Sequence, residues 1–573
     1  MTANLSDAGV AVNGQSSKTT DPPPVDRIVS SAHVTRLIMG LAAGLRLWQY
    51  VGNPSLTLDE LAVARNILSR PLSRLLTIPL DYSQVAPPGF LLGEKAAVAA
   101  FGPTEYALRL LPLVCALASV VAFRRVAARV LNPLSANVAL LLFAIGPVLI
   151  FHGSEVKQYS SDVAAALLLI GIALYLGERL LGPRRWCAAA VVGAVIVWCS
   201  QAAVLMVAGL GGAIVWFAAR ARDRASARRT AYAVSVWAAS ALAVTVASMQ
   251  SMRPETRGYM HRFWHNAFMP MPPRTLPQAL WLWDRLSDVF GPAGLSYPWP
   301  WLAVTLMAWG FVVLWRRSRE TTLTLLAPVL VALAASAAQQ YPFADRAILF
   351  LTPIFVLAVA ATIGQLYAIP RVGRTLAAAL VAVPIVGVIV EHPVYVLENA
   401  RPLFAYVETH RRPGDAIYVY YAGWQAYRYY GPRYGFSSSA ADIGGCHRGD
   451  PHAYLIEVDR LRGRPRAWIL FVHALRRLGE QSIMEDYLDQ IGHRLDHAVF
   501  PGTYARRSFE PATADLYDLS DTTLLPQTSA TEYLAVRPAP TTQRGFFATG
   551  VCDRGPQVPV EEYGHSDTRA SER

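Results

Sequence analysis

Long apolar runs separated by short polar connections dominate the first 391 residues of the chain. A helix needs about 20 consecutive apolar residues to cross the hydrocarbon core of a bilayer. Runs near that length predict eleven membrane spans, at 32–50, 105–123, 135–152, 158–177, 185–200, 202–219, 230–249, 299–315, 321–338, 346–367 and 373–391. The pattern therefore predicts a polytopic α-helical membrane protein.

Arginine clusters between these runs predict the orientation of the helices, because Lys and Arg are enriched in short cytoplasmic loops. Each cluster is separated from the next by two predicted spans, so all of them are expected on one side and the N-terminus is cytoplasmic. The clusters are Arg124, Arg125 and Arg129; Arg179, Arg184 and Arg185; Arg220, Arg222, Arg224, Arg228 and Arg229; Arg316, Arg317 and Arg319; and Arg371 and Arg374.

The segment 87–101 is apolar, but it is short and carries Glu94 and Lys95 in its middle. If it crossed the membrane, the N-terminus would lie opposite the basic loops, against the charge rule. We therefore predict that it is an interfacial helix within a long first outer loop, residues 52–104. The remaining outer regions between spans are then the turn 151–159, the loop 250–298 and the turn 339–346.

The chain after residue 391 is polar and is expected on the outer side. Strand-like runs alternate there with one helical pattern, an arrangement typical of a small α/β domain. The strands are predicted at 416–421, 466–473, 493–500 and 514–519, and the helix at 475–490. The expected parts are a disordered cytoplasmic tail (1–26), a membrane domain (27–391) and an extracytoplasmic α/β domain with a disordered end (392–573).

The cysteines divide in the same way. Cys115, Cys187 and Cys199 lie in apolar runs and are expected in the core, and no CxxC or Cys/His metal spacing occurs. Cys446 and Cys552 lie in the outer region, where thiols can be oxidised. We predict a disulfide between them, with two free thiols as the alternative.

Composition supports the membrane assignment. The chain is 53% hydrophobic and 16% charged, whereas a soluble protein carries about 25% charged residues. A net charge of +12 would suggest nucleic acid in a soluble protein. Because the arginines stand in short loops between apolar runs, we assign the charge to orientation in a membrane, with membrane lipids and no nucleic acid as partners. The N-terminal tail lacks the pattern of a cleaved signal peptide, and the Ala- and Arg-rich composition favours a bacterial inner membrane.

Ionisable side chains at the outer ends of the spans are the candidates for chemistry, since placing them near lipid is costly. Asp59 and Glu60 open a helix-like stretch of the first outer loop. They either take part in chemistry or interact favourably with the helix dipole. The turn 151–159 carries further candidates for the site. The alternative interpretation is a solvated loop in which the Lys and the Glu form an ion pair. These candidates are His152, Glu155, Lys157 and Tyr159.

Two further outer regions carry cations. Arg346 follows Tyr341 at the start of a span and could bind a phosphate through both guanidinium nitrogens, or extend to lipid head groups. Arg262 and His265 lie in the Trp-rich loop 250–298. An aromatic belt explains the tryptophans, whereas a site for an anionic group explains the Arg and His residues.

These motifs, in this order, resemble the GT-C superfamily of membrane glycosyltransferases, in particular the family 39-like branch of protein O-mannosyltransferases and lipid A aminoarabinose transferases. The resemblance covers most of residues 32–430. The similar stretches are Leu58-Asp59-Glu60, Ala86-Pro87-Pro88-Gly89-Phe90, Ala107-Leu108-Arg109-Leu110-Leu111-Pro112, Ser154 to Tyr159, Tyr341 to Pro353 and Arg401 to Tyr430.

The resemblance implies a polyprenyl-phosphate-linked sugar as donor, an acceptor hydroxyl on a lipid, glycan or protein, and inversion at the anomeric carbon. Asp59 is then the expected base, and Glu60 orients it or binds the sugar. Arg346 and Lys157 are expected to bind the leaving phosphate, with Arg262 or His265 as weaker candidates. Glu155 is expected to bind acceptor or sugar hydroxyls, and Tyr159 and Tyr341 are expected to bind substrate as well.

Two departures from the family pattern bear on this assignment. The aminoarabinose branch has a phosphate-binding Lys just before the proline-led helix, where this chain has Ser83-Gln84-Val85-Ala86. Many members have Arg at the position of Lys157. The missing Lys leaves open an inactive glycolipid-binding member of the family, and a transporter or flippase is the other alternative.

No cofactor is predicted with certainty. A divalent metal is an option if the acids Asp59 and Glu155 meet His152. Neither the sugar nor the acceptor follows from these patterns.

Overall fold

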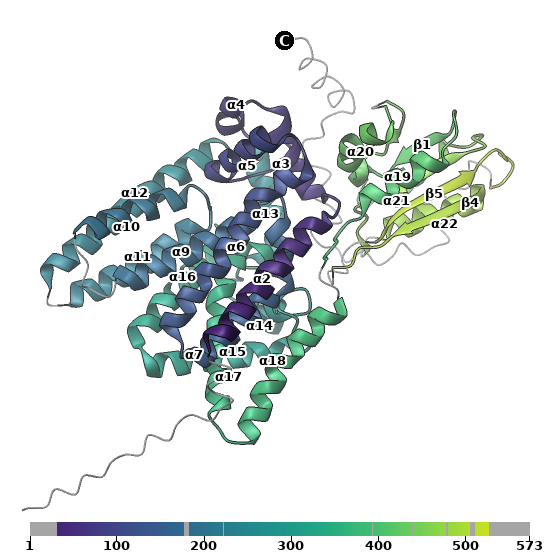
Figure 1. The fold of residues 1–573 in the computed structure, drawn as a ribbon. Helices are drawn as coiled ribbons and strands as arrows, with labels where there is room; N and C mark the ends of the chain where they lie inside the picture. The colour runs from purple at the N-terminus through teal and green to yellow at the C-terminus, as the bar shows by residue number, and fades with distance from the viewer. Residues whose placement is uncertain are drawn as a thin grey trace, which may run out of the picture.

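The computed structural model describes residues 31–176, 183–221, 223–391, 394–437, 439–447, 450–476, 479–504 and 510–525. The helices of the N-terminal part lie together in one bundle, and the sheet of the C-terminal part lies beside one end of that bundle, close to the helices of the first loop (Figure 1). The chain is therefore a helical membrane protein with a small α/β domain, as predicted.

A helix lies at each of the eleven segments that were predicted to span the membrane. They are α2 (Ala32–Gly52), α6 (Glu105–Val130), α7 (Pro133–Ile145) with α8 (Pro147–Phe151) and η1 (His152–Ser154), α9 (Tyr159–Leu176), α10 (Pro183–Val197), α11 (Ala203–Arg220), α12 (Arg224–Gln250), α15 (Pro300–Arg317), α16 (Arg319–Ala337), η3 (Asp345–Leu351) with α17 (Thr352–Tyr367), and α18 (Val372–Glu391).

Within the described residues, seven helices are long and apolar enough to cross a membrane: α6, α9, α11, α12, α16, α18 and the continuous segment η3–α17. The segment from α7 to η1 would be an eighth, bent by 60° at Gly146. Pro147 explains the bend, because a proline disfavours helical geometry at the residue before it. Helices α2, α10 and α15 are not among the seven, and α10 has only 15 residues, so a total of eleven spans stays a prediction.

Shorter helices fill the two long loops: α3 (Leu58–Ser69), α4 (Leu72–Thr77) and α5 (Pro88–Phe101) in the first, and α13 (Pro254–Phe263), η2 (His265–Ala267) and α14 (Leu276–Phe290) in the other. Helix α5 coincides with the predicted interfacial helix, and its 14 residues are too few to span. Glu94 of α5 is fully buried, and burial raises its pKa well above the ordinary value. The location of α5 at a membrane surface stays a prediction.

The C-terminal part holds a five-stranded sheet in the order β2-β1-β3-β5-β4. Strand β1 is parallel to β2 and β3, whereas β5 is antiparallel to β3 and β4. The predicted strands and the predicted helix are all present. The elements are α19 (Ala400–His410), β1 (Ala416–Val419), η4 (Tyr421–Gly423), α20 (Trp424–Tyr430), η5 (Gly431–Tyr434), β2 (Asp442–Ile443), α21 (Pro451–Asp459), β3 (Ala467–Phe471), α22 (Glu480–Ile491), β4 (His493–Phe500) and β5 (Ala512–Asp518).

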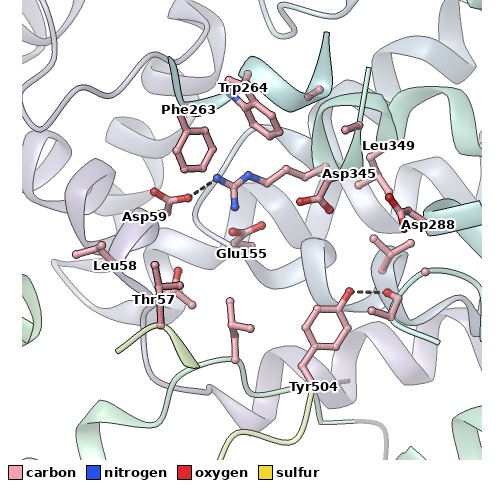
Figure 2. Close-up of a pocket in the computed structure, with 18 of the residues that line it drawn as sticks. Thr57, Leu58, Asp59, Glu155, Phe263, Trp264, Asp288, Asp345, Leu349 and Tyr504 are labelled. Atoms are coloured by element: carbon pink, nitrogen blue, oxygen red, sulfur yellow. Dashed lines mark hydrogen bonds and ion pairs between the residues drawn. The ribbon is translucent and has the colours of Figure 1, made fainter. Parts of the chain in front are cut away.

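Polar contacts attach this domain to the bundle. Glu105, at the start of α6, pairs with Arg401 and with Arg433, the latter at 2.9 Å. The hydroxyl of Tyr504 donates to the carbonyl oxygen of Ala293 at 2.6 Å, as Figure 2 shows. These contacts hold the domain against the start of α6 and against the loop 250–298. Residues of the domain and of the loops therefore face each other across the space between them.

The predicted disulfide involves one residue that the structure describes. Cys446 is disulfide-bonded, and Cys552 lies outside the described residues. Cys115, Cys187 and Cys199 are free thiols. The pairing of Cys446 with Cys552 stays a prediction.

Candidate functional site

A cavity of about 1240 Å³ lies between the bundle and the C-terminal domain. Every outer region predicted between spans contributes to its lining, although these regions are far apart in the sequence. The contributing segments are 57–59, 155, 259–267 together with 285–294, 344–349 and, from the C-terminal part, 397–398, 421–424, 473–476 and 504. The structure therefore brings the four predicted outer regions to one place.

The centre of the cavity holds an ion pair between Asp59 and Arg346, 2.7 Å from carboxylate oxygen to guanidinium nitrogen. Figure 2 shows the two side chains meeting across the cavity, with Phe263 and Trp264 beside the guanidinium. The Arg346 guanidinium carbon lies 5.7 to 6.0 Å from the ring centroids of Tyr159, Phe263 and Trp264. These distances fit cation–π contacts, which hold the guanidinium in place, while the Asp59 side chain stays 35% exposed.

The charge state of Asp59 follows from two opposing effects. Burial raises the pKa of its carboxyl, but the positive charges of Arg346, Lys157 and His473 outweigh burial and lower the pKa to about 2. Asp59 is therefore ionised throughout the physiological pH range, and its lone pairs are engaged mainly with Arg346.

Glu60 occupies a different environment from Asp59, although the two are adjacent. It forms a capping box with Thr57 at the start of α3 and accepts hydrogen bonds from Arg109 at 3.3 Å and from the backbone nitrogen of Val156 at 3.0 Å. Its side chain is buried and does not line the cavity. Glu60 thus connects the Asp59 loop to the turn that carries Glu155, an arrangement that favours the orienting role over contact with sugar, and both roles stay predictions.

Replacing Glu60 by Gln is expected to lower stability by about 3 kcal/mol, because it leaves the buried Arg109 charge without its carboxylate partner. The measurement is the unfolding midpoint of purified protein in detergent or nanodiscs. Glu255→Gln, at the exposed start of α13, is the matched control and should shift the midpoint little. An unchanged midpoint for Glu60→Gln would contradict the positioning role.

The turn between η1 and α9 supplies two further charged groups. Glu155 lines the cavity and pairs with the buried His152. The Lys157 amine donates to the side-chain oxygen of Gln84 at 2.5 Å. Lys157 thus lies against the segment 83–86. Burial lowers the pKa of the Lys157 amine, while the charges of Asp59 and Glu155 act in the opposite direction.

The remaining candidates divide between the cavity and other places. Tyr159 contacts Arg346 through its ring. The hydroxyl of Tyr341 donates to the Ala347 carbonyl at 2.8 Å, and Tyr341 does not line the cavity. Arg262 lines a separate hollow on α13, and His265 is exposed with its ring 3.3 Å from the side-chain oxygen of Asn266. The structure therefore does not place Tyr341, Arg262 or His265 around Asp59.

The metal option rested on Asp59, Glu155 and His152. In the part of the chain that the structure describes, no group of three or more His, Cys, Asp or Glu side chains is arranged as metal ligands. Glu155 is instead engaged with His152, and Asp59 with Arg346. Both carboxylates are therefore taken up by these pairs within the described residues.

Several cavity residues were not found from the sequence, and most belong to the C-terminal domain. Glu398 and His473 form a pair there, 2.6 Å apart, although 75 positions separate them in the chain. No spacing rule connects residues so far apart. His473 carried one signal, since it ends the predicted strand 466–473, and side chains at strand ends are often functional. The other cavity residues missed are Asp288, Asp345, Tyr421, Trp424 and Tyr504.

Comparison with protein-family models gives no match, and no curated protein matches the chain. Among solved structures, the chain is similar to ArnT from Cupriavidus metallidurans bound to undecaprenyl phosphate, with 12% identity, a TM-score of 0.47, and coverage of 84% of this chain and 97% of ArnT. It is also similar to the oligosaccharyltransferase of Archaeoglobus fulgidus in complex with zinc and sulfate, with 10% identity, a TM-score of 0.42, and coverage of 86% and 74%.

At TM-scores below 0.5 the overlap is loose, so the roles of individual residues rest on the site itself.

Proposed function

We propose that this protein is a membrane glycosyltransferase. It would transfer a sugar from a polyprenyl-phosphate donor to an acceptor hydroxyl, with inversion, on the extracytoplasmic face. The observation that carries the proposal is the Asp59–Arg346 pair, which places an ionised acid and a fixed cation together in a cavity of about 1240 Å³. The motif resemblance named above supports the same class of reaction.

Arg346 is the proposed binding group for the leaving phosphate. Its guanidinium has donors arranged to bind two phosphate oxygens at once, and three aromatic rings keep it in place. A cation placed before the reaction stabilises the charge that develops as lipid phosphate leaves, without reorganisation at that moment. Lys157 does not line the cavity, but its positive charge acts on Asp59 together with that of Arg346.

Asp59 is the proposed base. While Arg346 holds it, a pKa of about 2 makes it a weak proton acceptor. When the guanidinium turns to the donor phosphate, that stabilisation decreases and the carboxylate becomes more basic. The acceptor oxygen then bonds to the anomeric carbon, the bond from that carbon to the phosphate oxygen breaks, and the hydroxyl proton passes to Asp59. Attack opposite the leaving group accounts for inversion.

The direct test uses the full-length protein, purified in nanodiscs, with undecaprenyl-phosphate-linked mannose, arabinose and glucose as donors. Release of undecaprenyl phosphate together with a glycosylated acceptor is expected for at least one donor. An inactive glycolipid-binding protein would bind a donor without releasing undecaprenyl phosphate from it. A flippase would move the donor between leaflets of a vesicle and leave it intact, and either result would overturn the proposal.

The proposed orientation places the N-terminus in the cytoplasm of a bacterial cell and the C-terminal domain outside the inner membrane. It predicts that a membrane-impermeant maleimide labels Arg74→Cys in intact cells whose outer membrane has been permeabilised, and does not label Arg317→Cys. Both positions are exposed, and the background would carry alanine at Cys115, Cys187 and Cys199. Labelling of Arg317→Cys before lysis would reverse the orientation.

A further inference from the structure

The C-terminal domain forms one wall of the cavity with the ends of its parallel strands. Tyr421 follows the end of β1 by two residues, and His473 follows the end of β3 by two residues. Both side chains line the cavity, and β1 and β3 pair in parallel, so that their carboxyl ends lie at the same edge. This is the edge at which α/β sheets commonly bind ligands.

His473 is held there in a defined orientation. Its Nδ1 lies 2.6 Å from a carboxylate oxygen of Glu398, and the Glu398 side chain is 5% exposed. In the tautomer that carries its proton on Nδ1 and donates it to this carboxylate, Nε2 is a hydrogen-bond acceptor. The His473 backbone has a φ of 60°, a left-handed conformation that is uncommon for residues other than glycine and occurs often at functional sites.

His473 and Asp59 face the same space. Both side chains line the cavity, Asp59 from the first loop and His473 from the C-terminal domain. The wall that carries His473 and the loop that carries Asp59 can therefore contact one acceptor molecule together.

Trp424 gives the same wall a fixed aromatic surface. It lines the cavity, and contacts behind it hold its ring. The Arg65 guanidinium carbon lies 5.0 Å from the Trp424 ring centroid, and Tyr82 meets it edge-on at 5.4 Å. Arg65 is fixed in turn by a 3.1 Å hydrogen bond to Gln425. A rigid aromatic ring beside a few directed polar groups is the usual composition of a small-molecule pocket.

A peptide acceptor fits this wall less well. Extended peptides commonly bind by adding a strand to an exposed sheet edge. The strands whose ends reach the cavity, β1 and β3, each have two neighbours in the sheet, so neither offers a free edge there. A serine or threonine side chain also has one hydroxyl, and the proposed transfer uses that hydroxyl at Asp59, which leaves His473 without a ligand.

We propose that the acceptor is a carbohydrate with neighbouring hydroxyls, bound on the wall formed by Glu398, His473 and Trp424. The inference rests on the proposed transferase function and names the acceptor class for the same site. One hydroxyl attacks the donor and gives its proton to Asp59. A neighbouring hydroxyl donates to Nε2 of His473, and a face of the sugar ring packs on Trp424. His473 is then a positioning residue for the acceptor and does not take the transferred proton.

The test compares octyl hexosides with a blocked threonine-containing peptide as acceptors for the purified full-length protein. The donors are undecaprenyl-phosphate-linked mannose, arabinose and glucose. Wild type is expected to glycosylate an octyl hexoside in preference to the peptide. His473→Ala should raise KM for the hexoside roughly 5- to 30-fold, the value of one lost hydrogen bond, and change KM for the donor by about twofold at most. Trp424→Ala should raise the same acceptor KM.

The chain offers a matched control in the same domain. His447 also pairs with a carboxylate, Glu457, at 2.7 Å, and it does not line the cavity. His447→Ala should therefore leave both KM values near wild type. Monodeoxy hexosides sharpen the test, because one of them lacks the hydroxyl that His473 binds. For that acceptor, wild type and His473→Ala should have the same KM.

Each outcome has one meaning. Transfer to the peptide in preference to every hexoside overturns the carbohydrate assignment while the transferase proposal stands. The role of His473 is overturned if His473→Ala and His447→Ala change the acceptor KM equally. It is also overturned if His473→Ala raises KM by the same factor for every deoxy acceptor. Absence of phosphate release by wild type with all donors overturns the transferase proposal itself.

Discussion

Asp59→Asn is expected to lower the turnover of sugar transfer by roughly 10²- to 10⁴-fold, the usual contribution of a positioned general base. The amide keeps the size of the side chain and can still accept a hydrogen bond from Arg346, but it cannot take a proton. Since the substitution weakens the hold on Arg346, the guanidinium is more available to the donor phosphate. KM for the lipid-linked donor should therefore stay the same or fall while kcat falls.

The measurement is steady-state transfer by purified protein with the donor concentration varied. Asp81→Asn is a suitable control, because Asp81 is an acid of the same loop that pairs with Arg70 and Arg253 and does not line the cavity. It should leave kcat near wild type. Near-normal transfer by Asp59→Asn in protein that unfolds at the wild-type midpoint would falsify the base assignment.

Arg346→Gln is expected to lower transfer by roughly 10²- to 10³-fold, as removal of one preorganised group that stabilises transition-state charge does in other enzymes. It should also raise KM for the donor, because the same guanidinium binds the phosphate before the bond breaks. Arg346→Lys should recover only part of the activity, since an ammonium group cannot bind two phosphate oxygens in the geometry of a guanidinium.

Arg253→Gln is the matched control for Arg346. Arg253 pairs with an acid at 3.2 Å, as Arg346 does, but it lies outside the cavity lining. Its substitution should change neither kcat nor KM for the donor. Full activity of Arg346→Lys would mean that positive charge alone suffices, and full activity of Arg346→Gln would remove Arg346 from the mechanism.

Elements with a strong local signal were predictable from the sequence. Apolar runs of span length became helices because each such run must satisfy its own backbone hydrogen bonds in lipid. The segment 87–101, with Pro87 and Pro88 at its start and two charges in its middle, was predicted as a short helix and is one. The strand at 416–421 follows Pro413, Gly414 and Asp415 and was predicted from a β-branched and aromatic run, which is also a local signal.

Asp59 and Glu60 show where local reasoning stopped. They are adjacent carboxylates that the sequence does not distinguish, and their environments differ only in the folded structure. Thr57 and Arg109 turn Glu60 into a buried structural group, whereas Arg346, which lies 287 positions further along the chain, holds Asp59 at the cavity. The sequence could name both as candidates and could not divide the roles between them.

The sequence by itself determined that this is a helical membrane protein with a small α/β domain, and it located Asp59, Glu155 and Arg346 among the candidates. Only the tertiary structure decided that Glu60 is buried away from the cavity, that Lys157 lies against Gln84, and that Glu398 and His473 of the C-terminal domain line the cavity. The physical reason is distance along the chain: helix length, charge bias and turns depend on neighbouring residues, whereas a cavity wall depends on how separate segments pack.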